Sequence, residues 1–226
     1  MRNPSIFLGI TVLVATLLLI IFGITALSPV NVKRDNGSAT NSGITPVEKP
    51  TVVFGNPVRG EKDAKITIVV FGDFLCEPCA TIDVSLQKIL QDFPGKVRYI
   101  WKDFPNTTFH KDAMDAAIAA RCAQNQNAFW EYHDLLLTNQ ASINSQAYSI
   151  FAAKLNLNTS SFQQCLDAKT TQPIVEKDLE EGLGLNIDAT PYLFIDNRRV
   201  SGALEYQQLH DIVAAALEKI GQPSKK

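Results

Sequence analysis

The chain has 226 residues, of which 46% are hydrophobic and 19% are charged, and its formal net charge is −2. A chain of this length and composition accommodates one globular domain with appended segments. The near-neutral charge argues against nucleic acid as a partner, because nucleic-acid-binding domains carry a marked excess of lysine and arginine.

The N-terminal segment predicts a membrane anchor. Residues 6–27 carry no charged side chain, and as a helix they would span about 33 Å, enough to cross a bilayer core of about 30 Å. Arg2 precedes this run, so the positive-inside rule places the N-terminus in the cytoplasm and the rest of the chain outside. The alternative is a cleaved signal peptide, but its apolar region is normally only about 7–15 residues long, and Pro29 is unfavourable after a cut at Ser28. We expect a single-pass cell-membrane protein anchored by residues 1–28, and either interpretation exports the domain.

Residues 29–50 are rich in Ser, Asn, Gly, Thr and Pro and show no apolar periodicity. This composition is typical of a flexible stalk. The globular domain is therefore expected over residues 51–226.

The first half of the domain has the pattern of a β–α–β crossover unit. Residues 65–71 form an apolar, β-branched run typical of a strand buried on both faces. A helical pattern follows Cys76 and ends at Pro94-Gly95, with one apolar face formed by Ile82, Leu86, Ile89 and Leu90. Residues 97–104 give the next strand, which Pro105 ends.

A long helical block follows, and we interpret His110 as its start rather than as a catalytic group. Its expected helices cover residues 113–123, 129–137, 146–155 and 160–168, and a last helix runs from Pro173 to about Gly182. Strand character returns at 192–195 and near Val200, and an amphipathic helix over 205–219 closes the chain. This order predicts an α/β, thioredoxin-like fold with a helical insertion at about 110–184.

Four motifs occur along the domain in a recognisable order. They are GDFLCEPC at 72–79, KDFP at 102–105, ARCA at 120–123 followed by FWEYHDL at 129–135, and ATPYLF at 189–194. In order and spacing they resemble the DsbA-like thioredoxin-fold oxidoreductases, and the resemblance covers about residues 52–220.

The CxxC motif formed by Cys76, Glu77, Pro78 and Cys79 carries the expected chemistry. A cysteine at the N-terminus of a helix faces unpaired N–H groups and the positive end of the helix dipole, which favour its thiolate. We therefore expect Cys76 to be the nucleophile and Cys79, one turn further in, to be the resolving thiol. Attack on one sulfur, a mixed disulfide and its resolution make up the cycle.

A zinc site is the main alternative for these cysteines, but zinc requires four converging ligands. Cys122 and Cys165 are 43 positions apart on separate expected helices, and the three histidines lack ligand spacing. We expect neither a metal nor a cofactor. Exported thiols tend to oxidise, and of the three possible pairings we expect the local Cys76–Cys79 bridge, which leaves Cys122 and Cys165 for a second one. Some DsbA-like relatives resemble this chain in having such a second, structural bridge.

The resemblance implies roles for three further residues. Thr190 and Pro191 match the position of the cis-proline that faces the CxxC in thioredoxin-fold enzymes, where the backbone of the preceding residue binds substrate as an added strand. Lys102 matches a lysine on the facing strand that tunes the charge near the cysteines. Val70 occupies the position of an acid that helps to deprotonate the resolving thiol in many relatives, and valine cannot do so.

The resemblance and the exported location together predict a dithiol oxidase that introduces disulfides into newly exported polypeptides. A membrane quinone-linked thiol oxidase is the recycling partner that the family implies. Glu77 opposes the oxidising direction, because its charge raises the energy of a neighbouring thiolate. A disulfide reductase or isomerase is therefore the alternative, and a non-catalytic thioredoxin-fold binding module is a more distant one.

Overall fold

The computed structural model describes residues 49–196 and 198–221. The predicted anchor over 1–28 and nearly all of the predicted stalk over 29–50 lie outside these residues. Among the residues that are described, no helix combines the length and the apolar composition needed to cross a membrane.

A five-stranded sheet in the order β1-β3-β2-β4-β5 forms the centre of the domain. The parallel pairing of β2 with β3 is flanked by antiparallel neighbours on both sides. The strands are β1 (Val58–Gly60), β2 (Ile66–Gly72), β3 (Val97–Asp103), β4 (Tyr192–Ile195) and β5 (Arg198–Ser201). Both central strands are almost completely buried. The apolar, β-branched sequence of β2 requires this burial, whereas β3 also buries the charged residues Lys102 and Asp103.

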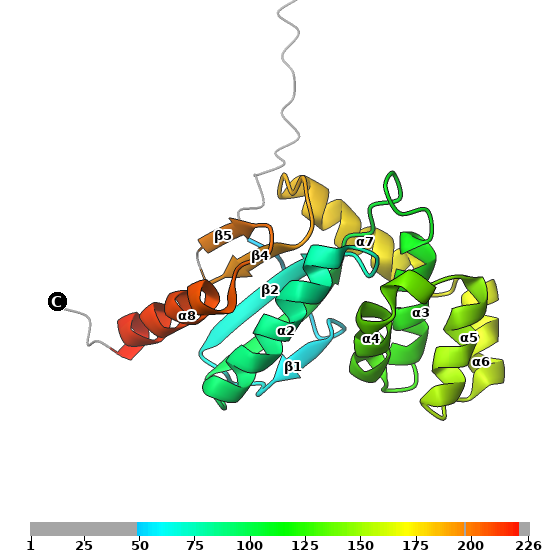
Figure 1. Ribbon diagram of the computed structural model, residues 1–226, viewed down its shortest axis with the longest axis horizontal. Helices are drawn as coiled ribbons and strands as arrows, with labels where there is room; N and C mark the ends of the chain where they lie inside the picture. The colour runs from blue at the N-terminus through cyan, green and yellow to red at the C-terminus, as the bar shows by residue number, and fades with distance from the viewer. Residues whose placement is uncertain (1–48, 197, 222–226) are drawn as a thin grey trace, which may run out of the picture. The chain divides into compact units, whose positions relative to one another are not determined.

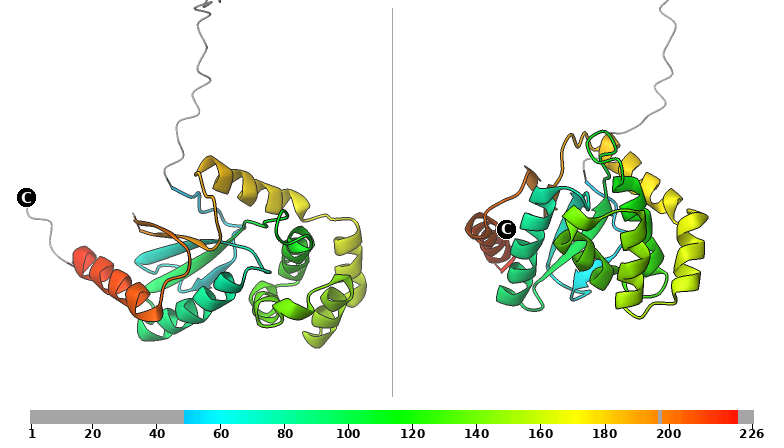
Figure 2. Two further views of the ribbon diagram at one scale, coloured as in Figure 1. Left: turned by 45° about the horizontal axis from the view of Figure 1, so that its top comes forward. Right: turned by 45° about the vertical axis from the view of Figure 1, so that its right-hand side comes forward.

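Helices cover both faces of the sheet. Figures 1 and 2 show α2 (Glu77–Asp92) and α8 (Tyr206–Gly221) side by side on one face, and α7 (Gln172–Gly184) on the opposite one. The sheet therefore packs into two apolar clusters, a large one with α2, α8 and most of the other helices and a smaller one near the end of α7.

The helical insertion between β3 and β4 is built around α3 (Ala113–Gln124), whose alanines are buried. These small side chains let other helices of the insertion approach closely. The remaining helices of the insertion, besides α7, are α4 (Phe129–Thr138), the 3-10 turn η1 (Gln140–Ser142), α5 (Ser145–Lys154) and α6 (Thr159–Asp167). Asn158 caps α6 by accepting a 2.9 Å hydrogen bond from the backbone N–H of Ser161.

The mixed α/β thioredoxin-like architecture with a helical insertion is confirmed, with three local differences. The short strand β1 was not expected, because three residues are too few to show a periodic pattern. The strand β3 ends at Asp103 rather than at Phe104. The first helix of the insertion begins at Ala113 as expected, but His110, the expected start of the helical block, lies in the loop before it.

Candidate active site

Cys76 and Cys79 lie where β2 gives way to α2, and they form a disulfide. Cys76 is the N-cap residue of α2, and its sulfur accepts a 3.2 Å hydrogen bond from the backbone N–H of Cys79. Cys76 is 5% exposed, whereas Cys79 is completely buried. A thiol from outside can therefore approach Cys76 more readily than Cys79, and the donors at the helix end favour the thiolate of Cys76 after reduction.

The loop before β4 faces this disulfide across 114 residues of sequence. The Thr190–Pro191 peptide bond is cis, and the carbonyl oxygen of Thr190 lies 3.4 Å from the sulfur of Cys76. Asp188 and Ala189, just before this bond, are exposed. The two residues expected to bind substrate thus lie beside the expected nucleophile, next to backbone that an extended peptide can approach.

Glu77 and Pro78 begin α2, and both are exposed. Their position gives Pro78 a natural place in the first turn, where its missing N–H group is not needed. Solvent around Glu77 screens its repulsion of a thiolate at Cys76, so its effect is weaker than that of a buried carboxylate.

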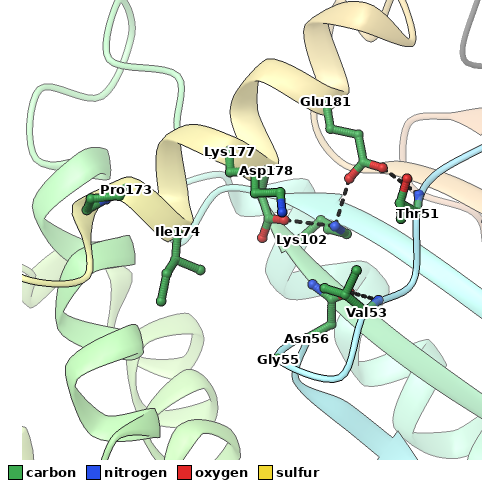
Figure 3. Close-up of a pocket in the computed structure, with 10 residues that line it drawn as sticks. All are labelled: Thr51, Val53, Gly55, Asn56, Lys102, Pro173, Ile174, Lys177, Asp178 and Glu181. Atoms are coloured by element: carbon green, nitrogen blue, oxygen red, sulfur yellow. Dashed lines mark hydrogen bonds and ion pairs between the residues drawn. The ribbon is translucent and has the colours of Figure 1, made fainter.

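Lys102 lies on β3, and its buried ammonium group pairs with two acids of α7. The nitrogen is 2.8 Å from Asp178 and 2.7 Å from Glu181 (Figure 3). Within residues 49–196 and 198–221, we find no hydrogen bond or ion pair between Lys102 and either cysteine of the CxxC motif. The expected tuning role stays a prediction, whereas the ion pairs show what this lysine binds.

One of these acids, Asp178, also belongs to a buried network of charged side chains. Arg121 of α3 lies 2.7 Å from Asp178 and 2.5 Å from Asp103, with its side chain fully buried. Burial, together with the neighbouring carboxylate of Asp103, raises the pKa of Asp178, while Arg121 and Lys102 act in the opposite direction. This network joins two helices of the insertion to the end of β3.

A cavity of about 680 Å³ lies beside this network, between α7 and the segment that precedes β1 (Figure 3). Its lining includes Val53, Ile174 and the polar groups of Lys102, Asp178 and Glu181, but neither cysteine. The cavity is therefore separate from the redox pair.

A buried carboxylate three residues before the nucleophile holds the active-site turn from one side. Asp73 accepts hydrogen bonds from the backbone N–H groups of Leu75 and Asn106, and its Oδ2 lies 2.8 Å from Nδ1 of His110. His110 therefore does not start the helix but connects the loop before α3 to this turn. The sequence singles out His110 but does not predict its contact with Asp73.

Gln140 holds the same turn from the other side, and the sequence-based predictions do not include this residue. Its side-chain amide donates 2.9 Å hydrogen bonds to the carbonyl oxygens of Phe74 and Cys76. The only available signal would have been a polar residue at the end of the aromatic helix α4.

Asp83, His133 and Asp134 bring potential metal ligands within 4.8 Å of one another. Their carboxylates are already bound by protein donors, since Tyr99 donates to Asp83 and Arg59 to Asp134. Burial acts to raise the pKa of Asp134, but the hydrogen bonds from His133 and Arg59 lower it overall. We therefore assign this cluster no metal.

The CxxC at a helix N-terminus, with a cis-proline opposite, defines a thiol–disulfide oxidoreductase domain of the thioredoxin type. The family described as thioredoxin matches residues 53–215, and the chain belongs to this family. Its more specific identification as a DsbA-like protein disulfide oxidoreductase is also confirmed by the relatives that follow.

Disulfide bond formation protein D of Bacillus subtilis is 26% identical over 191 residues, which cover 79% of this chain and 85% of that protein. The catalytic domain of Proteus mirabilis ScsC superposes with a TM-score of 0.63 at 26% identity, over 73% of this chain and 90% of that one.

A third relative is much longer than this chain. The Na(+)/H(+) antiporter NhaA 1 of Salinispora arenicola is 31% identical over 176 residues, which cover 78% of this chain but only 27% of the antiporter. The chain thus spans about a quarter of the length of this relative, and the likeness concerns one part of it.

Proposed function

We propose that this protein is an extracytoplasmic dithiol oxidase, which introduces disulfides into exported polypeptides through the Cys76–Cys79 pair. The observation that carries the proposal is that Cys76, at the N-terminus of α2, is slightly exposed whereas Cys79 is completely buried. A substrate thiolate attacks the sulfur of Cys76 and breaks its bond to the buried Cys79, giving a mixed disulfide. A second substrate thiolate then attacks the substrate sulfur, so the substrate leaves oxidised and both cysteines are left reduced.

Trapping of the mixed disulfide tests the roles of the two cysteines. In Cys79→Ala the free thiolate of Cys76 attacks a disulfide of a substrate and expels one substrate thiolate. No Cys79 thiol is present to release the bound substrate, so a disulfide between Cys76 and the substrate should accumulate and be visible on non-reducing gels. Cys76→Ala is the matched control and should trap little. Trapping by Cys76→Ala alone would reverse the assignment.

The likeness to a disulfide bond formation protein supports the oxidising direction of exchange. The negative charge of Glu77 favours the alternative, a reductase or isomerase. We expect a reduction potential between the values of about −270 mV for thioredoxin and about −120 mV for DsbA. Equilibration with a glutathione redox series measures it. A value at or below that of thioredoxin would replace the oxidase with a reductase.

Glu77→His should raise this potential by tens of millivolts, because it removes a negative charge near the thiolate, and about 30 mV corresponds to 1.4 kcal/mol. Glu131→His is a matched control, since Glu131 is also an exposed acid in the first turn of a helix. Equal shifts in both variants, or none in either, would show that Glu77 does not act on the cysteines.

The location belongs to the same proposal. The uncharged run over 6–27 supports a retained anchor, and a membrane quinone-linked thiol oxidase is the proposed recycling partner. Intact mass of the native protein should include Met1 or Arg2, and the protein should stay with membranes after carbonate washing. A mature N-terminus near Leu27 would rule out the anchor.

A further inference from the structure

Gln140 connects the helical insertion to the active-site turn. It is the first residue of η1, two positions after the end of α4, and it is 64 positions from Cys76 in the sequence. Its Nε2 nevertheless lies 2.9 Å from both the carbonyl oxygen of Phe74 and that of Cys76. One amide group therefore spans the two residues that lead into and carry the nucleophile.

These two carbonyl groups lie where regular secondary structure cannot hold them fully. Phe74 follows the end of β2. Within the described part of the chain, the hydrogen bond that its carbonyl oxygen accepts comes from Gln140. The carbonyl of Cys76 also accepts the first helical bonds, from the N–H groups of Cys79 at 3.0 Å and Ala80 at 3.3 Å. Gln140 thus adds an outside donor at the point where the chain turns into α2.

The donor itself is held in place. The carbonyl of Gln140 accepts the backbone N–H of Ile143 at 3.2 Å, and the side chain of Asn139 bonds to the carbonyl of Leu135 at 2.7 Å. Gln140 is half-buried, so its side chain has less freedom to lose than that of an exposed glutamine. A fixed, uncharged donor of this kind costs little reorganisation during a reaction.

We propose that Gln140 is a positioning residue of thiol–disulfide exchange, whose amide fixes the turn before α2 so that the sulfur of Cys76 stays over the helix N-terminus. Without it, the turn would sample positions in which the sulfur loses the 3.2 Å bond from the N–H of Cys79, and the thiolate would be less favoured. This inference rests on the exchange chemistry of the Cys76–Cys79 pair and not on its direction.

The test uses the full chain with Cys76 and Cys79 reduced and the other disulfide intact. Gln140→Leu removes the donors at similar volume, and Gln140→Glu places a carboxylate against two carbonyl oxygens. The rate at which iodoacetamide alkylates Cys76 is measured from pH 4 to 10. Because one hydrogen bond is worth about 0.5–1 pH unit in such a profile, we expect the midpoint to rise by about that much in Gln140→Leu and by more in Gln140→Glu. The limiting rate at high pH should stay unchanged.

Gln126 provides matched controls, because it bonds to both the N–H and the carbonyl of Asn158 elsewhere in the insertion. Gln126→Leu and Gln126→Glu should keep the wild-type profile. Gln140→His retains a ring N–H donor, so its midpoint should rise less than that of Gln140→Leu. This variant also tests the proposal if Gln140→Leu fails to fold.

Two results would overturn the proposal. One is a wild-type profile in Gln140 variants whatever their melting temperature, which would make the residue structural only. The other is an equal shift in the Gln126 variants. A low reduction potential would discard the oxidase direction but would leave this profile as expected, so the two failures are distinguishable.

Discussion

Lys102 offers a sharp test of whether a buried charge serves the fold or the redox pair. The substitution Lys102→Met removes the ammonium group and keeps most of the side-chain length. It leaves Asp178 and Glu181, which lie 2.8 and 2.7 Å from the nitrogen, without this cation. Removing one partner of a buried ion pair costs about 3–5 kcal/mol, because the remaining charge is left unpaired.

Two features of the site place the expected loss of stability near the lower end of this range, at about 3 kcal/mol. Asp178 keeps its ion pair with Arg121 at 2.7 Å, and the side chain of Glu181 is 14% exposed and can take up water. We therefore expect a loss of about 3 kcal/mol in the free energy of unfolding. For a domain of 150–250 residues this corresponds to a fall in melting temperature of about 6–12 °C.

Urea unfolding with both disulfides intact measures the stability, and equilibration with glutathione measures the potential. Lys177→Met is the matched control, because Lys177 lines the same cavity but is exposed on α7. This substitution should change the free energy of unfolding by less than about 0.5 kcal/mol. We expect the potential of Lys102→Met to stay near the wild-type value. A loss of stability below about 1 kcal/mol, together with a potential changed by about 30 mV or more, would refute this reasoning and assign the lysine to redox tuning.

Two further predictions concern stability outside the active site. Replacing both Cys122 and Cys165 by alanine removes the disulfide between α3 and α6. The free energy of unfolding in urea should fall by about 2–5 kcal/mol, while turnover of a small dithiol stays intact. Lost turnover in a folded protein would indicate an electron relay instead. Bonds to His133 and Arg59 lower the pKa of Asp134 against the raising effect of burial, so its ionised form stabilises the fold above about pH 4 and this contribution disappears as the pH falls. Asp134→Asn should therefore be less stable by under about 1 kcal/mol at pH 7, because the carboxylate is partly exposed, and a difference that does not shrink as the pH falls from 7 to 3 would contradict the assignment.

The sequence predicts the elements whose patterns are long and local. The apolar run of β2 and the periodic apolar face of α2 locate both elements to within a residue or two. The caps and alanines of the insertion likewise locate its helices. The strand β1 could not be predicted, because its three residues are held by antiparallel pairing with β3. Pairing between distant segments produces no recognisable pattern in so short a sequence.

The same distinction separates the predicted and unpredicted parts of the site. Cys76, Cys79 and Pro191 belong to motifs in which neighbouring residues carry the information. Gln140 and His110 reach the active-site turn only because the insertion packs against the end of the sheet. A glutamine after a helix has many possible partners, and only the tertiary structure selects two carbonyl groups far away in the sequence.

The insertion is more than an addition to a thioredoxin framework, since its charged residues complete the end of the sheet that carries the cysteines. Asp103 pairs in register with Gly72, the last residue of β2 before the active-site turn. Arg121 of α3 and Asp178 of α7 bind this end of β3 through fully buried or nearly buried side chains. Separating the insertion from the sheet would leave these charges unpaired in the interior and would release the donors of Gln140 from the turn. Because buried charges without partners are so costly, the insertion and the sheet constitute one cooperative unit, and the geometry of the nucleophile depends on both.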